Sequence, residues 1–595
     1  MNKQLQQNPA ASNDWFGHPK GVYICFATEM WERFSFYGMK ALLFLYLTKY
    51  HLFGDTPSYE LLGAYGGLVY AMPLIGGMLA DRYLGMRRAV ILGGILLVLG
   101  HAGMAYEGHA AYLANGEVVR DTGALQVFYL SLALIITGVG FLKPNISTIV
   151  GKLYPANDPR RDSGFTLFYA GINLGALAAS LIAAFLGEVY GWKWGFGAAG
   201  VGMLIGLIVF ISGQKHLHGL AEPNHPERLR ERAFGPLNRE WSIYLGSLLM
   251  VAAVWQVIQW HSIYLELPLS ALGLSQDFSQ SAVLMIMNAV FLIFLLWFGW
   301  FLVKRCTPQQ RHQMLVLMAL ILAALIFFTL YEQTYGSWVA FTDRLMTKDL
   351  FGFALEGEQG IPWMIFPLAL SPPLLALALN ARSATVVRIS SIGIIAVMLG
   401  FVVALFHDIV LMPQTAGSLT FLGAFFIVVL SPVFSWLWPW LAKRGLNPSK
   451  PAKSAIGLLL AGVAFVPMLL AAQTAGDGVM ASVWWLVLAY LVLEMGELSL
   501  SPVGLSAVTQ LSVASVVSVM MGAWFLATAY SEVLAAELGK LAAIDDLASD
   551  GALNMTAAAA KYQELFMLMV WLGLGAGVLY LLLTPLLKRG MHGVE

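Results

Sequence analysis

Charged side chains are scarce in this chain. Asp, Glu, Lys and Arg make up 11% of its 595 residues, and 58% of the residues are hydrophobic. Soluble domains carry roughly a quarter charged residues, so a chain of this composition cannot cover a water-facing surface. A soluble globular protein is therefore excluded. The formal net charge is +0 at pH 7, so the charge indicates no nucleic-acid partner.

Cysteine is almost absent, and so are the sequence signatures of catalysis. Cys25 and Cys306 lie far apart and in no motif, so we expect two free thiols and no disulfide framework. We find no metal-ligand spacing, nucleophile elbow or phosphate-binding loop, which argues against an enzyme or a bound metal. The N-terminal residues are polar and lack an apolar stretch that could be cleaved as a signal. The first spanning helix is therefore expected to direct targeting.

Long apolar runs dominate what is present. Runs of roughly 20 residues, the length that crosses a bilayer as a helix, recur along the whole chain. We count about sixteen, beginning near residues 20, 61, 88, 124, 163, 195, 243, 281, 312, 361, 389, 419, 453, 482, 515 and 563. The residue alternation expected of a membrane barrel is missing. The sequence therefore predicts an all-α polytopic membrane protein.

The distribution of Lys and Arg among the loops predicts which ends lie inside. With the N-terminus in the cytoplasm, the inner loops carry most of the basic residues, as cytoplasmic loops do. Loops 262–280 and 408–418, on the other side, contain no Lys or Arg, whereas 338–360 and 540–562 carry mixed charge. An even number of spans with both termini cytoplasmic fits this pattern.

The longest inner loop divides the chain into two groups of spans. Six spans precede it, and of the later spans six carry polar or charged residues while four are bland. Two six-helix bundles around a midplane site are the organisation of a major facilitator transporter, here with additional helix pairs. The predicted segments are a cytoplasmic tail (1–19), an N-terminal six-helix bundle (20–213), a cytoplasmic linker (214–240), an inserted helix pair (241–303), a C-terminal six-helix bundle (304–587) with an extra pair at 361–407, and a cytoplasmic tail (588–595).

Few ionisable residues lie inside the spans. Each costs several kcal/mol when it faces lipid, so such residues normally face a cavity or a partner. They are Glu29, Glu32, Arg33, Lys40, Lys143, Glu332, Glu494, Glu497 and Glu532, with His101 at the end of a span. The early spans hold the lysines and the arginine together with two glutamates, and the later spans hold glutamates alone. A zwitterion such as a two- or three-residue peptide matches this separation of positive and negative charge and can bridge a central cavity.

The charges of the first span lie on one stripe of a helix. Steps of three and four residues connect Glu29, Glu32, Arg33, Phe36, Tyr37 and Lys40. A structural ladder of salt bridges that clamps this helix to a neighbour is one interpretation. A cavity-facing stripe that binds a ligand or exchanges protons is the other.

Three further motifs place polar groups at prolines or among small residues. Lys143 precedes Pro144, and a proline in a span kinks the helix and frees a backbone carbonyl. Glu332 lies far from the ends of its span, and a carboxyl that pairs with Lys143 in one state and is protonated in another would couple proton entry to helix rearrangement. Asn173 lies in mid-span, where an interhelical hydrogen bond and a ligand contact are both open interpretations.

The stretch GMLADRYLGMRR (77–88) lies at an inner turn. Its glycines permit close packing, and Asp81 can cap a helix or pair across helices. A solvated positive loop explains Arg87 and Arg88 but not the spacing of the glycines and the aspartate.

Six ordered motifs resemble those of the proton-dependent oligopeptide transporter (POT) family, within the major facilitator superfamily. The first span matches the pattern ExxERFxYYG from Glu29 to Gly38, with Phe36 at a usual Tyr. The others are GGMLADRYLG (76–85), GFLKPNIS (140–147), FTLFYAGINLGAL (165–177), YEQ…GSW (331–338) and GELSLSPVGLS (496–506). The matches run from about residue 22 to 344 and from 432 to 530.

The resemblance implies a role for each matched residue. Arg33 and Lys143 would bind the peptide carboxylate, and Asn173 and Glu497 the amine end. Further substrate contacts would come from Tyr37, Lys40, Tyr70 and Trp524, proton coupling from Glu29, Glu32, Arg33, Lys143 and Glu332, and gating from Asp81 and Arg82. No cofactor and no obligate protein partner is expected, with protons as co-substrate in a bacterial inner membrane.

Some positions depart from the family pattern. Lys40 stands where the family usually has Arg, which keeps the charge but loses the planar fork. Phe328 stands at a usual Trp, and Gly423-Ala424 at a usual Asn-Pro pair. Glu494 replaces a usually uncharged residue, and we hypothesise that it compensates for the lost amine contact.

Three functions are therefore weighed. The first is a proton-coupled symporter that imports di- and tripeptides by alternating access. The second is a proton-coupled symporter for a non-peptide anion or a drug-like solute, against which the intact ExxER triad counts. The third, a membrane enzyme or channel, has no supporting motif.

Overall fold

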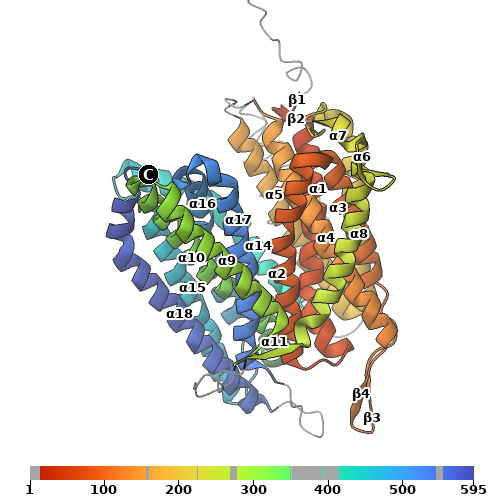
Figure 1. Cartoon of the computed structure of the whole chain (residues 1–595). Coiled ribbons are helices and arrows are strands. Elements are labelled where there is room, and N and C mark those ends of the chain that lie inside the picture. Colours follow the sequence, from red (N-terminus) through yellow and green to blue (C-terminus); the bar gives the residue numbers. More distant parts are fainter. Residues whose placement is uncertain are drawn as a thin grey trace, which may run out of the picture.

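The computed structural model describes residues 14–155, 158, 160–223, 225–267, 278–348, 350, 393, 414–544 and 554–594. These residues form long helices that run side by side (Figure 1). Thirteen helices in the described part are long and apolar enough to cross a membrane, which confirms the predicted all-α polytopic membrane fold. A further long helix, α1 (Lys20–Leu45), carries the charged stripe.

Each of these fourteen helices lies at a predicted span. The two remaining predicted spans, which begin near 361 and 389, lie outside the described residues apart from residue 393. Their assignment as an extra helix pair stays a prediction.

The first half of the molecule, as we use the term, comprises α1 to α6. Helix α1 packs against α5 and α6, α3 packs against α4 and α6, and α2 packs against α4. The elements are α1 (Lys20–Leu45), η2 (Tyr46–Tyr50), α2 (Asp55–Leu79), η3 (Ala80–Leu84), α3 (Met86–Met104), α4 (Thr122–Lys152), α5 (Arg161–Ala179), η4 (Ser180–Ala184), η5 (Leu186–Tyr190) and α6 (Trp192–Gly213).

The second half comprises α10 to α18. Helix α15 packs against α16 and α18, and α10 contacts α15, α16, α17 and α18. The elements are α10 (Pro308–Tyr331), η9 (Glu332–Tyr335), α11 (Ser337–Leu345), η10 (Ser418–Thr420), α14 (Phe421–Lys443), α15 (Lys450–Gly476), α16 (Trp484–Leu511), η11 (Ala514–Val516), α17 (Val517–Gly539), η12 (Lys540–Ala542) and α18 (Met555–Gly590).

Two helices that lie between the halves in the sequence are at the periphery of the molecule. Helix α8 (Arg239–Ile258) packs against α4, and α9 (Ala282–Arg305) contacts α10 and α17. Both expose many large apolar side chains, as helices that face lipid do. The connections around them contain η6 (Gln214–Leu217), α7 (Pro226–Arg230) and η7 (Gln259–Ser262).

Four small antiparallel hairpins lie in the described parts of the connections. They are β1 (Asp14–Trp15) with β2 (His18–Pro19), β3 (Tyr112–Ala114) with β4 (Glu117–Val119), β5 (Arg232–Phe234) with β6 (Leu237–Asn238), and β7 (Tyr264–Leu267) with β8 (Phe278–Ser281). Each has two strands, so none forms a layer of the fold.

Local sequence signals explain where several helices begin. The side chains of Asp121, Asn238, Ser281 and Asn554 accept hydrogen bonds from backbone N–H groups in the first turns of α4, α8, α9 and α18. Helix α10 begins with a capping box, in which Thr307 and Gln310 bond each other's backbone.

Two pairs of helices join the two halves. Helix α2 packs against α17, and α5 packs against α14. Figure 1 shows β1, β2 and the C-terminus at the same end of the molecule, which we call the terminal end. The opposite end carries α11, and we call it the closed end because polar contacts join the halves there.

Candidate functional site

A cavity of about 140 Å³ lies between the two halves. It is lined by residues of α1, α2, α5, α10, η9, α14, α16 and α17. Five predicted site residues line it, namely Tyr37, Tyr70, Asn173, Glu332 and Glu497. A hollow of about 410 Å³ between α2, α4 and α8 has a mainly apolar lining and contains none of the predicted site residues.

The charged stripe of α1 forms a buried ion-pair group beside the cavity. The Nε atom of Arg33 lies 2.5 Å from Glu32 Oε2 and 3.2 Å from Glu29 Oε1. All three side chains are almost fully buried, and Arg33 Nη2 is buried without a hydrogen-bond partner. These ion pairs lie within α1, so they do not clamp it to a neighbour as the predicted structural ladder would, and one guanidinium nitrogen is left without a partner. The roles predicted for these residues stay predictions.

Lys143 lies behind Tyr70 and, like Arg33 and Lys40, is not among the residues that line the cavity. Its ammonium nitrogen lies 4.4 Å from the centre of the Tyr70 ring, a cation–π contact. Pro144, the next residue, lies inside α4. The predicted pairing of Lys143 with Glu332 is not the one found in this structure, because Glu332 binds Lys40.

Lys40 connects the halves at the centre of the molecule. Its ammonium group lies 2.7 Å from Glu332 Oε2 and 2.6 Å from Glu532 Oε1. The lysine belongs to α1 in the first half, and both glutamates belong to the second half. Helix α10 stops after Tyr331, the 3-10 turn η9 follows, and Glu332 at the start of this turn lines the cavity.

The partnership of Glu532 was not predicted. The sequence identifies it as an acidic residue inside an apolar span, which signals a functional or paired position but names no partner. Gly66 of α2 makes room for it, because a Cβ there would lie 2.5 Å from Glu532 Oε2.

The opposite wall of the cavity carries Asn173 and Glu497. The Asn173 amide donates to the carbonyl of Tyr169 one turn earlier (3.0 Å), so this hydrogen bond lies within α5 and not between helices. Glu497 faces the cavity from α16. Trp524, predicted to form another wall, is 5% exposed and is not among the lining residues; it packs where a Cβ on Gly504 would collide with its ring.

The predicted gating residues lie at the surface. Asp81 and Arg82 are exposed in η3, and Arg82 lies over the Tyr83 ring. Gly85, at the end of this turn, has φ +78°, and a Cβ there would collide with the backbone of Pro223. The motif therefore packs against the linker between the halves.

Polar contacts close the cavity at the closed end. They join Arg344 to Asp55 (2.6 Å), Lys49 to Asp343 (2.6 Å), Lys540 to Glu60 (3.1 Å) and the Gly417 N–H to Glu188 (2.9 Å). Within the described ranges, no ion pair joins α1–α6 to α10–α18 at the terminal end. None of these closing residues was predicted, because each is an ordinary loop or helix-end charge in the sequence.

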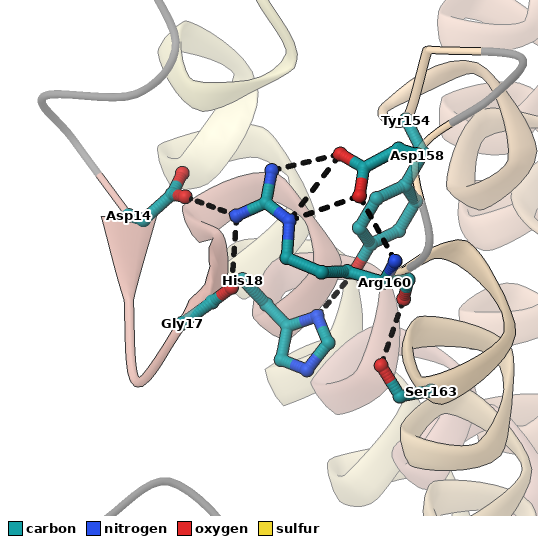
Figure 2. A network of polar contacts seen from close by, with 7 residues as sticks. All are labelled: Asp14, Gly17, His18, Tyr154, Asp158, Arg160 and Ser163. Carbon is teal, nitrogen blue, oxygen red and sulfur yellow. Dashed lines mark hydrogen bonds and ion pairs between the residues drawn. The ribbon is translucent and has the colours of Figure 1, made fainter. Parts of the chain in front are cut away.

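A separate polar network holds the N-terminal hairpin at the terminal end. Figure 2 shows the Arg160 guanidinium between Asp14 (2.6 Å) and Asp158 (2.8 Å). His18 Nδ1 lies 2.7 Å from the Tyr154 hydroxyl. Hydrogen bonds from Arg160 lower the pKa of Asp158. Burial, together with the nearby Arg160 charge, lowers the pKa of His18.

The described part of the chain contains no group of three or more His, Cys, Asp or Glu side chains placed to hold a metal ion. The residues that line the cavity offer charge pairing and hydrogen bonding.

Comparison with known proteins gives matches over almost the whole chain. A sequence model described as the POT family matches residues 87–361 and 414–550. The chain is 32% identical to the uncharacterized transporter YclF of Bacillus subtilis, covering 98% of this chain and 96% of that protein. It is 30% identical to the peptide transporter YePEPT of Yersinia enterocolitica (91% and 92% covered) and 30% identical to a di-/tripeptide transporter of Lactococcus lactis (90% and 92% covered).

Solved structures of peptide transporters are also similar to this chain over almost its whole length. The crystal structure of peptide transporter POT in complex with sulfate has a TM-score of 0.70 at 30% identity and covers 98% of this chain and 97% of that one. A mutant form of peptide transporter POT in complex with alafosfalin has a TM-score of 0.70 at 29% identity, with the same coverage.

Proposed function

This chain belongs to the POT family, and on that basis we propose that it is a proton-coupled symporter that imports di- and tripeptides by alternating access. Relatives named as peptide transporters and as di-/tripeptide transporters support the substrate class. The observation that carries the proposal is the division of charge about the cavity. The basic groups Arg33 and Lys143 lie behind the lining tyrosines of one wall, and Glu497 lines the other.

The basic wall suits a peptide carboxylate. Arg33 has an unpartnered buried nitrogen, and Lys143 lies against Tyr70, which lines the cavity. A guanidinium or ammonium that donates to a carboxylate makes a charge-assisted hydrogen bond, stronger than a neutral one. Arg33 and Lys143 are therefore assigned to the carboxylate end of the substrate.

The acidic wall suits the peptide amine. Glu497 and Asn173 both line the cavity and can accept hydrogen bonds from an ammonium group. No ion pair within the described residues neutralises Glu497, so a ligand ammonium would supply the missing charge. Tyr37 and Tyr70 lie among the lining residues between these ends.

Proton coupling is assigned to the buried ion pairs. Glu29 and Glu32 share Arg33, and Glu332 shares Lys40 with another carboxyl group. Protonation of one carboxyl weakens its pair, and a pair that joins the two halves, such as Lys40 with Glu332, then releases them. This couples proton binding to the opening and closing of the cavity.

We infer the location from charge and family. Basic residues are concentrated in the loops at the terminal end, which supports cytoplasmic termini in a bacterial inner membrane. The closed end would then face outward, and this conformation would be closed to the outside.

Uptake by reconstituted protein tests the proposal. In liposomes with an inward proton gradient, we expect accumulation of labelled di- and tripeptides that collapses with a protonophore. Glu332→Gln is expected to bind peptide but to lose gradient-driven uptake. If peptides do not compete for binding while a non-peptide anion is accumulated, the substrate class is wrong.

A further inference from the structure

Two glutamates of α16, Glu494 and Glu497, form an acidic pair that differs from the others beside the cavity. The other pairs each contact a cation, Arg33 or Lys40. In the part of the chain that the structure describes, no ion pair with Lys, Arg or His involves Glu494 or Glu497. This wall therefore has two carboxyl groups and no protein cation.

The two carboxyl groups have different surroundings. Glu497 lines the cavity, whereas Glu494 is 0% exposed and lies behind it, one helical turn away. The Tyr331 hydroxyl donates to Glu494 Oε1 (3.3 Å). The space for Glu494 comes from Gly423 of α14, because a Cβ there would lie 2.9 Å from Glu494 Oε1.

Elementary chemistry limits the protonation of this pair. Glu494 Oε2 and Glu497 Oε2 are both buried without a hydrogen-bond partner, and two carboxylates that are both ionised can only accept hydrogen bonds, so neither could satisfy the other. A proton on one of the two lets it donate to the other, and a buried site of low dielectric favours that state over two like charges. The fully buried member is Glu494, and the charge is better solvated on Glu497, which faces the cavity.

We propose that Glu494 is a positioning residue, a neutral carboxylic acid that donates a hydrogen bond to Glu497 and holds it ionised toward the cavity. A hydrogen bond to the charged form of an acid stabilises that form. Glu497 is thereby ready to bind an ammonium group before substrate arrives. This inference rests on the proposed function and adds a residue to its amine-binding end.

The groups that face the pair add no unpaired charge that would determine which carboxyl group is protonated. Those that interact with it are Tyr37 of α1, Tyr169 of α5, Tyr331 of α10, Glu332 of η9 and Tyr490 of α16. The tyrosines are neutral at working pH, and Glu332 is bound to Lys40. Helix α14 presents Gly423, and no titratable group of α14, α15 or α17 was found to interact with the pair in the described residues.

Binding measurements on two substitutions test the proposal. The full-length protein in detergent is titrated with alanyl-alanine by calorimetry between pH 5 and 8. Glu494→Gln retains an N–H donor for Glu497, so we expect its Kd and pH profile to match the unsubstituted protein within about three-fold. Glu494→Leu removes the donor, and because a hydrogen bond to a charged group is lost, Kd should rise about ten- to hundred-fold. The loss of binding on acidification should also begin at a higher pH.

The control is an N-acetylated dipeptide, which has no ammonium group. Its affinity is expected to be the same in all three proteins, and a similar loss in Glu494→Leu would show a structural effect and overturn the proposal. Equal weakening in Glu494→Gln and Glu494→Leu would show that Glu494 acts as an anion, which also overturns it. If Glu494→Leu does not yield a monodisperse protein, the pH profile of Glu494→Gln alone decides, because a shifted profile contradicts the neutral-donor role.

Failure of the proposed function gives a different result. If the unsubstituted protein binds no peptide with a free amine, the peptide-transport proposal fails. If it binds such peptides and the variants do not follow the expected order, only the role of Glu494 fails.

Discussion

At the residue scale, Lys40 is the side chain with the most demanding environment. It is 1% exposed and touches two carboxyl groups from the other half of the molecule, so this buried cluster has one more acidic than basic group. A lysine offers three donors from one point, which suits two separate carboxylates better than the planar fork of an arginine. Removal of one partner of such a buried group is costly because a charge is left unpaired.

We therefore expect Glu532→Gln to alter coupling more than substrate binding. The variant keeps Lys40 paired with Glu332 but removes the excess carboxylate that can take up a proton. Gradient-driven uptake should fall at least about ten-fold, while peptide exchange across liposomes without a gradient persists. The measurement compares the two assays on one preparation. Unchanged gradient-driven uptake would contradict a role of Glu532 in coupling.

The hairpin network of Figure 2 gives a prediction for pH. The pKa of His18 is lowered from its ordinary value of 6.5, so the neutral form favours the docked hairpin. Docking free energy is therefore fully present above pH 6.5 and is lost as the pH falls toward the lowered pKa. Hydrogen exchange of the backbone amides of residues 14–18 should show decreasing protection from pH 7 to pH 5, after correction for intrinsic exchange.

A variant without a titratable group serves as the control for this effect. In His18→Gln, protection of the hairpin should not change over the same pH range. The same decrease in the variant would assign the effect to another group. Asp158 does not interfere, because its lowered pKa places its titration below the ordinary value of 3.8.

At the scale of elements, glycines determine how closely α2 and α4 approach. A Cβ on Gly76 of α2 would lie 2.1 Å from the carbonyl oxygen of Gly140 in α4. Small residues at such crossings let helix backbones pack together in a membrane. The contact orders α4, the helix that carries Lys143, relative to the cavity.

Gly76→Ala should destabilise the protein because a backbone atom must shift to accept the methyl group. Overpacking of this kind costs about 1–3 kcal/mol, and thermal denaturation in detergent should show a lower Tm. Gly299→Ala in α9 is the matched control, since nothing lies within 4 Å of a Cβ there. Alanine favours a helix over glycine by up to about 1 kcal/mol, so the control should not lose stability. Equal Tm values for both variants would contradict the close-packing argument.

The elements also show which features a sequence can predict. Long apolar runs specify helices because a bilayer leaves few alternatives, so the positions of the described helices follow from length and composition. The stop of α10 after Tyr331 does not follow, because the run from 308 to 345 reads as one continuous span. The pairing of Glu332 with Lys40 and not with Lys143 does not follow either, because it depends on how separate helices pack against one another.

At the scale of the whole molecule, the ion pairs between the two halves could not be predicted from the sequence. Spacing along a helix showed that Glu29, Glu32 and Arg33 share a face, and they do pair. The partners Asp55 and Arg344 are 289 residues apart, and no local pattern connects them. Such contacts depend on the relative placement of the halves, which alternating access would change.

The bidentate pair of Asp55 and Arg344 predicts how the closed end can be opened. Both guanidinium nitrogens lie 2.6 Å from the carboxylate, which is 2% exposed. Breaking a buried pair costs about 3–5 kcal/mol, so Asp55→Asn should shift the equilibrium away from the closed state at least ten-fold.

A disulfide across the closed end measures this shift. The hydroxyl oxygens of Ser180 in η4 and Thr420 in η10 lie 2.8 Å apart, so cysteines at these two positions should crosslink only while the halves are in contact. The native Cys25 and Cys306 are buried and should not compete. Asp55→Asn should slow crosslinking by at least about ten-fold, and the exchange of charges in Asp55→Arg with Arg344→Asp should restore part of the rate. If Asp55→Asn crosslinks as fast as the parent, this ion pair does not hold the closed end, and the remaining contacts of Lys49, Glu60 and Glu188 are sufficient.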